Sequence, residues 1–273
     1  MDASPRPLQP FTLDVGSGVR INYFDSGGQG PAVVMLHGLA GSAREFFQTA
    51  SVLPEFRTIL IDLRGHGRST RRPGDVSRKA FVDDVIRVIE KAAGAPVTLV
   101  GQSMGGHTAM LLAAARPDLV HQLVLLETGP GSGDPAQREA LGQFLRSWPV
   151  PFASHKAARR FLGDGPLEKA WVEDLEERRD GLWPSFDPDV MVGAITEVSA
   201  PRWAEWESIR APTWVVYGEN GMFTAEEKSE FVLRGHNVQR RELSGASHDA
   251  HLDAFEEWVS VLTSVLPTAP NSQ

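Results

Sequence analysis

Short apolar runs alternate with longer helix-forming stretches along most of the chain. The apolar runs, each long enough for one buried strand, occupy residues 32–36, 58–61, 97–100, 121–126, 213–217 and 238–243. Helix-forming runs separate them, at residues 43–51, 78–93, 104–115, 224–233 and 249–266. Strands that alternate with helices predict a mostly parallel sheet, because each crossover helix returns the chain to the same edge. We therefore expect an α/β fold with a doubly wound sheet.

Two segments depart from this alternation. Residues 11–14 and 19–24 alternate in polarity around Gly16-Ser17-Gly18, which predicts an antiparallel hairpin at the edge of the sheet. From about residue 128 to 208 the strand pattern lapses, and short helical pieces are expected at residues 137–146, 157–162, 167–179 and 189–197. We interpret the chain as a core domain, residues 1–128 and 209–273, with a helical cap inserted at residues 129–208.

The predicted cap holds five of the seven tryptophans, which are Trp148, Trp171, Trp183, Trp203 and Trp206. A small helical lid needs large side chains to close its own core, and burial is the usual fate of aromatic residues. The alternative is that some of them line an apolar substrate pocket.

The strongest chemical signal is the segment Gly101-Gln102-Ser103-Met104-Gly105, which follows an apolar run and leads into a helix-forming run. A serine at the tip of a strand-turn-helix unit sits in a strained backbone conformation, and flanking glycines allow the close approach that this turn requires. The five-residue pattern is weak by itself, and its structural context gives it meaning. We predict a nucleophile elbow with Ser103 as the nucleophile.

Two further loops follow predicted strands in the same way. The first strand ends in His37-Gly38-Leu39, and the second ends in Asp62-Leu63-Arg64-Gly65-His66-Gly67-Arg68-Ser69. Together with the elbow, these loops resemble the α/β-hydrolase superfamily, and the resemblance covers nearly the whole chain. That superfamily hosts esterases, lactonases, dehalogenases, epoxide hydrolases and carbon-carbon hydrolases, so the resemblance implies a fold and leaves the substrate open.

A serine hydroxyl needs a histidine to accept its proton, and the chain has eight histidines. His248 follows the last predicted strand and precedes the last helix, where the resemblance places the catalytic histidine. His251 should lie one turn inside the helix and further from the elbow. His37 and His66 are expected to brace loops. The remaining histidines, expected in surface or helical positions, are His107, His121, His155 and His236.

The acid departs from the common family pattern. Many members carry an aspartate after strand 7 of the sheet, but here that stretch reads Tyr217-Gly218-Glu219-Asn220-Gly221 and offers no aspartate. Strand 6 ends in Glu127, at a position that resembles the acid of some haloalkane dehalogenases and of zearalenone-type lactonases. We predict Glu127 as the acid, with Glu219 or a weakened Ser-His dyad as alternatives. Glu127 could instead anchor the cap.

The resemblance also implies an oxyanion hole made of two backbone N–H groups, those of Leu39 and Met104. Preorganised donors of this kind stabilise the charge that develops on the carbonyl oxygen. The helix that starts at Met104 adds its positive end to the same place.

A serine at position 103 argues against dehalogenase and epoxide-hydrolase chemistry, which uses an aspartate nucleophile. We predict a carboxylesterase or lactonase that acts on a small, apolar substrate through an acyl-enzyme on Ser103. Carbon-carbon hydrolases commonly have a tryptophan where this chain has Asp249, which weakens that alternative. A cofactor-free perhydrolase and a slow-turnover receptor with a hydrolase fold also remain open.

Composition excludes several other classes of protein. The 273 residues carry a formal net charge of -8 and no basic block, so nucleic-acid binding is not expected. The absence of cysteine excludes a thiolate nucleophile. We expect no metal or organic cofactor, because neither ligand spacing nor a phosphate loop is visible. The N-terminus shows no leader pattern and no apolar run reaches the roughly 18 residues of a membrane span, so we expect a cytoplasmic protein that does not bind membranes.

Overall fold

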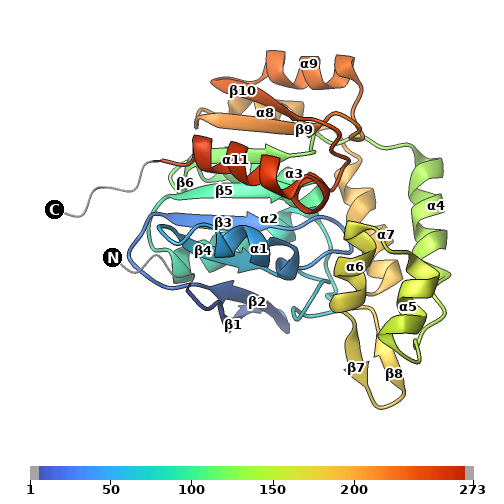
Figure 1. Cartoon of the computed structure of the whole chain (residues 1–273). Coiled ribbons are helices and arrows are strands. Elements are labelled where there is room, and N and C mark those ends of the chain that lie inside the picture. Colours follow the sequence, from blue (N-terminus) through green and yellow to red (C-terminus); the bar gives the residue numbers. More distant parts are fainter. Residues whose placement is uncertain (1–5, 268–273) are drawn as a thin grey trace.

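The fold is built on one central sheet, within a computed structural model that describes residues 6–267 (Figure 1). The strands of this sheet are β1 Gln9–Gly16, β2 Val19–Asp25, β3 Ala32–Leu36, β4 Arg57–Ile61, β5 Val97–Gln102, β6 Val120–Leu126, β9 Thr213–Gly218 and β10 Val238–Leu243. They lie in the spatial order β1-β2-β4-β3-β5-β6-β9-β10. All neighbours from β4 to β10 pair in parallel, whereas β1 and β2 form an antiparallel edge hairpin. The expected α/β sheet and its edge hairpin are confirmed.

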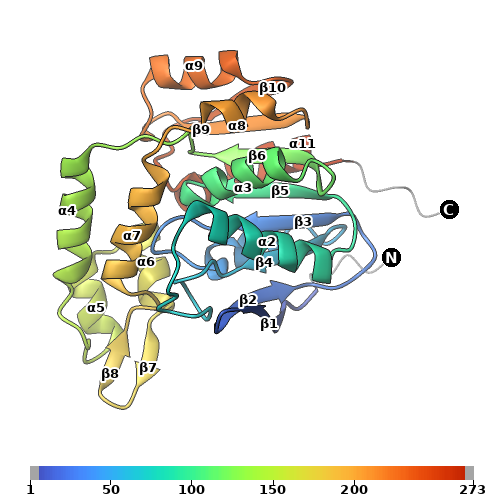
Figure 2. The same ribbon diagram turned by 180° about the vertical axis from the view of Figure 1, so that it is seen from behind.

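Helices cover both faces of the sheet (Figure 2). The helices of the core are η1 Ala43–Phe46, α1 Phe47–Ser51, α2 Arg78–Ala92, α3 Met104–Ala115, α9 Ala225–Arg234, α10 Ala250–Asp253 and α11 Phe255–Val265. In Figure 1, α1 and α11 lie on one face, with α2 and α3 behind the sheet. No helix within residues 6–267 is long and apolar enough to cross a membrane.

The two faces of the sheet form two separate hydrophobic clusters, because successive side chains of a strand point to opposite faces. Strand β3 illustrates the division. Val34 and Leu36 are buried in the cluster beneath α2 and α3, whereas Val33 and Met35 are buried in the cluster beneath α1 and α11. A strand that is buried on both faces reads as a continuous apolar run, which explains why the sequence located these strands well.

Most of the segment between β6 and β9 projects beyond the carboxyl edge of the sheet, whereas its last helix lies beside β9 and β10 (Figure 1). Its elements are α4 Pro135–Arg146, α5 His155–Leu162, α6 Pro166–Glu173, β7 Glu176–Arg178, β8 Gly181–Trp183, α7 Pro188–Val198 and α8 Trp203–Ser208. The single helix expected over residues 167–179 is wrong, because α6 ends at Glu173 and the antiparallel pair β7–β8 follows. The turn lies at residues 179–180, Gly181 follows it with a φ of 136°, and Phe152 pairs with Leu182, so the hairpin gains a strand contact that is distant in sequence.

The tryptophans of this segment divide between two cores. Trp148 is buried in an aromatic cluster of the projecting segment, with Trp171 packed against it at a ring-centroid distance of 5.4 Å. Trp206 of α8 is 1% exposed and stacks on Phe231 of α9 at 4.0 Å, within the cluster beneath α2 and α3. The helix α8, which the sequence placed in the cap, therefore packs on the sheet domain.

Candidate active site

Ser103 lies at the tip of a sharp turn between β5 and α3. Its φ of 52° and ψ of −119° put a non-glycine residue in a strained part of conformational space. The turn is possible because its neighbours lack side chains: a Cβ on Gly101 would lie 2.5 Å from the Gly105 carbonyl oxygen. A Cβ on Gly105 would lie 2.4 Å from the carbonyl oxygens of Leu36 and His37. The serine hydroxyl is thereby held at the carboxyl edge of the sheet.

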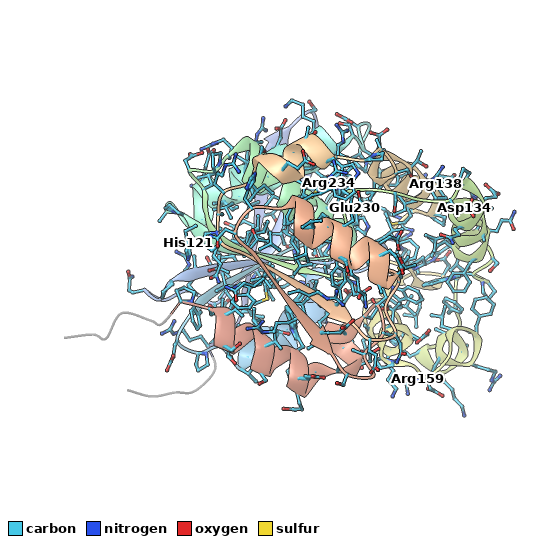
Figure 3. All side chains as sticks on the ribbon, turned by 90° about the horizontal axis from the view of Figure 1, so that it is seen from above. His121, Asp134, Arg138, Arg159, Glu230 and Arg234 are labelled. Atoms are coloured by element: carbon cyan, nitrogen blue, oxygen red, sulfur yellow. The ribbon has the colours of Figure 1, made fainter. Side chains whose placement is uncertain are left out.

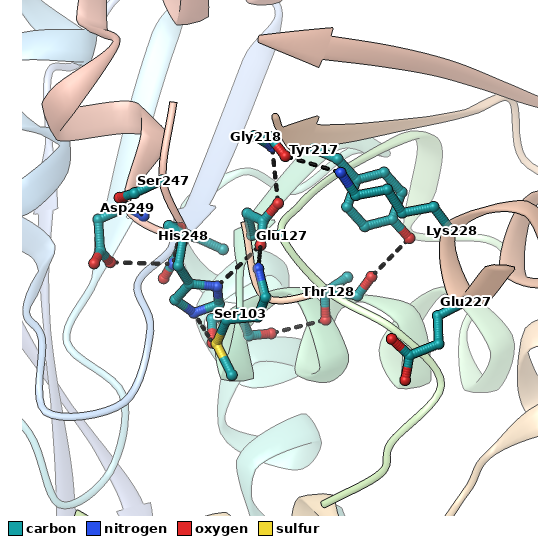
Figure 4. Close-up of polar contacts among 12 residues, drawn as sticks. Ser103, Glu127, Thr128, Tyr217, Gly218, Glu227, Lys228, Ser247, His248 and Asp249 are labelled. Carbon is teal, nitrogen blue, oxygen red and sulfur yellow. Dashed lines mark hydrogen bonds and ion pairs between the residues drawn. The ribbon is translucent and has the colours of Figure 1, made fainter. Parts of the chain in front are cut away.

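A chain of hydrogen bonds joins Ser103 to His248 and Glu127 (Figure 4). The Ser103 Oγ lies 2.9 Å from His248 Nε2, and His248 Nδ1 lies 3.1 Å from Glu127 Oε2. A carboxylate can only accept, so it favours the imidazole tautomer with the proton on Nδ1. The other ring nitrogen, Nε2, is then free to accept the proton of the serine hydroxyl.

Glu127 is fully buried at the end of β6, with a φ of 47° that turns its side chain toward the histidine loop. Its Oε1 accepts the Gly218 N–H at 2.8 Å, and its Oε2 accepts the Met222 N–H at 3.0 Å. Gly221 leaves the room for this carboxylate, since a Cβ there would lie 2.1 Å from Oε1. Backbone donors of this kind replace the hydrogen bonds to water that a buried carboxylate loses.

Glu219, the alternative acid, faces a different group. Its Oε2 accepts the N–H of Gly245 at 2.8 Å in an exposed position. The structure thus brings Glu127, rather than Glu219, against the imidazole of His248.

The turn His37-Gly38-Leu39 packs directly on the elbow. A Cβ on Gly38 would lie 3.4 Å from the Ser103 Cβ and 2.2 Å from the Gln102 Oε1. Within residues 6–267, the N–H groups of Leu39 and Met104 donate no hydrogen bond to the protein. Both donors are therefore available to an oxygen atom bound at Ser103.

Two buried histidines hold the neighbouring loops, as expected. His37 Nδ1 lies 2.7 Å from the Gly38 carbonyl oxygen, and its Nε2 accepts the Leu63 N–H at 3.0 Å. His66 Nδ1 lies 2.8 Å from the Arg64 carbonyl oxygen. Burial lowers the pKa of His37 to about 4 and that of His66 to about 3, so both rings are neutral near pH 7 and act as structural braces.

The other histidines lie outside the hydrogen-bonded chain. His107 is buried in α3, whereas His121 is exposed near the start of β6. Figure 3 shows His121 at the opposite end of the molecule from Asp134 and Arg138 of the projecting segment. His121 lies at the start of β6, whereas Ser103 follows the end of the parallel neighbour β5, so the two residues lie at opposite edges of the sheet.

His251 belongs to α10 and contacts Glu45 rather than Ser103. Its Nε2 lies 3.4 Å from Glu45 Oε2, and its ring stacks on Phe46 at 4.7 Å. Both side chains are buried, which lowers the pKa of His251 to about 4 and raises the pKa of Glu45 to about 8. The carboxyl group also packs on Gly41, where a Cβ would lie 2.4 Å from Oε1, so Glu45 supports the loop that carries Leu39.

Glu45→Gln is expected to stabilise the protein at pH 8. A carboxyl group whose pKa rises from 4.5 to about 8 on folding stabilises the fold at low pH, and this contribution is lost as pH rises through 8. An amide of the same shape avoids that loss, which we expect to be worth about 4 kcal/mol at pH 8 and about 1 kcal/mol at pH 5. Urea unfolding at pH 5, 6, 7 and 8 measures the difference. Glu256→Gln, on the exposed surface of α11, is the control, and parallel pH profiles for Glu45→Gln and wild type would contradict the prediction.

The sequence did not predict the backbone N–H groups that hold the Glu127 carboxylate in place. The donors at Gly218 and Met222 are backbone N–H groups, which no side-chain pattern reveals. Gly221 was a visible signal, because a glycine in that loop leaves space for a neighbouring group. Sequence reasoning also missed Thr128, whose Oγ1 donates to the Ser103 carbonyl oxygen at 2.9 Å (Figure 4).

This arrangement combines a hydroxyl group, a base that can accept its proton, a buried carboxylate that orients the base, and two available N–H donors. Such a set can carry out acyl transfer, since each step has a group within reach of the reacting atoms. Within residues 6–267, no cluster of three or more histidine and acidic side chains is placed to hold a metal ion.

Comparisons with known proteins agree with this geometry. The sequence profile of the alpha/beta hydrolase fold matches residues 31–255. An sn-1-specific diacylglycerol lipase of Mus musculus is 38% identical over 262 residues, which cover 90% of this chain and 84% of the relative. An (E)-2-((N-methylformamido)methylene)succinate hydrolase of Acinetobacter baylyi is 26% identical, with 95% and 98% covered. The crystal structure of an E-2-(acetamidomethylene)succinate hydrolase shares the fold, with a TM-score of 0.86 at 21% identity over 94% of this chain and 98% of that chain.

Proposed function

Because this chain belongs to the α/β-hydrolase fold family, we propose that it is a serine hydrolase that cleaves a carboxylic ester or lactone through an acyl-enzyme on Ser103. One observation carries the proposal: the Ser103 hydroxyl, the His248 imidazole and the Glu127 carboxylate form one hydrogen-bonded chain. That chain supplies a nucleophile, a base and an orienting acid. The lipase among the relatives supports an ester as the bond that is cleaved.

In the first half of the reaction, the Ser103 Oγ attacks the carbonyl carbon of the substrate while His248 Nε2 takes the hydroxyl proton. The carbonyl oxygen becomes an oxyanion, which accepts hydrogen bonds from the N–H groups of Leu39 and Met104. When the tetrahedral intermediate collapses, His248 gives the proton to the leaving alkoxide, and an acyl-Ser103 ester remains. For a lactone, the alcohol stays attached to the acyl group.

In the second half, His248 Nε2 takes a proton from water, and the resulting hydroxide attacks the acyl carbon. The same two N–H groups stabilise the second oxyanion. Collapse releases the carboxylic acid and returns the proton from His248 to the Ser103 Oγ. Glu127 keeps the proton of Nδ1 in place through both halves and stabilises the imidazolium each time it forms.

A cavity beside the oxyanion loop supports a small-molecule substrate. It has a volume of about 350 Å³ and lies between η1, α1 and α6. Apolar side chains and charged side chains both line it: the apolar ones include Phe47, Trp171 and Leu252, and the charged ones are Arg44, Glu45, Lys169, Glu173 and Asp174. Volumes of this order accommodate small ligands. Ala40 and Gly41, which follow Leu39, line this cavity, whereas Ser103 and His248 do not, so we propose that it holds only the part of an ester furthest from the reacting carbonyl.

The test is the release of p-nitrophenol from p-nitrophenyl esters of short and medium acyl chains. We expect sustained turnover, and the chain-length profile will report the size of the acyl site. A single burst without further turnover would indicate a receptor that is acylated once. No release from a folded protein would contradict the ester proposal.

A further inference from the structure

The side chain of Gln102, the residue before Ser103, reaches the loop that carries His248. Gln102 is 1% exposed, and its Nε2 donates to the His248 carbonyl oxygen at 3.0 Å. The same nitrogen lies 3.4 Å from Asp249 Oδ1, within hydrogen-bonding distance. One buried amide therefore ties the strand of the nucleophile to the backbone of the base.

Other side chains also contact the loop of residues 244–248, and they do so at solvent-exposed positions. Glu219 accepts the Gly245 N–H at 2.8 Å, and Asp253 accepts the Ser247 N–H at 3.1 Å. Both contacts precede His248 in the chain and are solvent-exposed, so they are expected to be weak. The Gln102 amide contacts the His248 peptide group itself, and it comes from the same turn as the Ser103 Oγ. It is therefore placed to set the distance between hydroxyl and imidazole.

Asp249 adds a second negative group next to His248. Charged and titratable groups near its carboxyl group are His248, His251, Glu45 and Asp253. Burial raises the pKa of Asp249, and the neighbouring His248 opposes that rise. The amide of Gln102 supplies the hydrogen-bond donor that a partly buried carboxylate requires.

We propose that Gln102 and Asp249 are a positioning pair: Gln102 holds His248 at the correct distance from Ser103, and Asp249 orients the Gln102 amide by accepting from its Nε2. Neither residue touches the reacting atoms. The proposal rests on the proposed serine-hydrolase function and extends it to two residues that the three-residue chain does not include.

The test compares Gln102→Met, which keeps the length of the side chain and removes the donor, with Gln102→His, which restores an N–H donor. We expect Gln102→Met to lower kcat about 10-fold or more with KM changed less than about 2-fold, because small misplacements of a catalytic group are costly. Gln102→His should recover most of the lost kcat. A kcat for Gln102→Met within 2-fold of wild type would overturn the role of Gln102, and so would equal kcat values for the two variants.

Asp249→Asn tests the second member of the pair through a double-mutant cycle with Gln102→Met. Asp249→Asn should lower kcat about 2-fold or more in the wild-type background and have little further effect in Gln102→Met, because the two side chains act through one contact. Equal effects of Asp249→Asn in the two backgrounds, or no effect in either, would overturn the role of Asp249.

A second readout separates this proposal from the proposed function. A fluorophosphonate probe reacts with an activated serine whether or not the substrate is an ester, and the labelling rate reports the Ser103–His248 geometry. If wild type is labelled but hydrolyses no ester, the ester proposal fails. The labelling rates of wild type, Gln102→His and Gln102→Met, which should fall in that order, still test the positioning pair. Thermal melting of each variant confirms that it is folded. Equal labelling rates in wild type and Gln102→Met would contradict the inference.

Discussion

Ser103→Ala is expected to lower kcat for ester hydrolysis by at least about 10⁴-fold, because the acyl-enzyme can no longer form. KM should change little, since the hydroxyl contributes little to binding of the ground state. The fold should persist, because the substitution removes one side-chain hydrogen bond, that of the Ser103 Oγ with His248. The strained turn itself is held by the close backbone packing that the flanking glycines allow. Initial rates of p-nitrophenol release at equal protein concentration measure the effect.

The matched control is Ser260→Ala, on an exposed position of α11, which should retain wild-type activity. Mass spectrometry after exposure to a fluorophosphonate should show one adduct on wild type and none on Ser103→Ala. Residual turnover in Ser103→Ala close to the wild-type rate would mean that another group performs the chemistry, and the acyl-enzyme proposal would fail.

Glu127→Gln is expected to lower kcat by about 10²- to 10⁴-fold with little change in KM, the result of losing the group that orients His248. The carboxylate accepts N–H groups from Gly218, Met222 and His248 through its two oxygens. An amide has one oxygen, so its NH₂ group must face at least one of these donors. The imidazole then loses its preferred tautomer or its position.

Glu219→Gln is the control for that experiment, since Glu219 is also an acidic residue near the histidine loop and its carboxylate contacts the Gly245 N–H. It should keep most of the wild-type kcat. Because Glu127 is fully buried, thermal melting of both variants is needed to separate lost activity from lost fold. A large loss in Glu219→Gln with none in Glu127→Gln would reverse the assignment of the acid.

The sheet could be predicted from the sequence because its strands are buried on both faces and therefore form short continuous apolar runs. Strand β3 spans the predicted residues 32–36, and helix α3 spans the predicted residues 104–115. The elbow was equally visible, since the strained turn at Ser103 requires glycines at fixed spacing around it. These features depend on neighbours that are close in the sequence.

The projecting segment was predicted less well because contacts distant in sequence decide its elements. The β7–β8 hairpin forms where local periodicity favoured a helix, and the bridge between Phe152 and Leu182 adds to that pairing. Likewise, Trp206 packs on Phe231 of the sheet domain rather than in the cap, which the sequence position of α8 does not reveal. The β7–β8 pairs themselves are local, whereas Phe152 lies 30 residues before Leu182 and Phe231 lies 25 residues after Trp206.

By itself, the sequence determined the order along the chain of the strands of the central sheet, the position of the elbow and the likeness to the hydrolase fold, because local patterning and close packing of glycines encode all three. Only the tertiary structure decided which acidic side chain meets His248, because that contact joins residues 121 positions apart. It depends on β6 lying beside β9, on the positive φ of Glu127 and on the space left by Gly221. The contact between Gln102 and the His248 loop, 146 positions away, depended on the tertiary structure for the same reason.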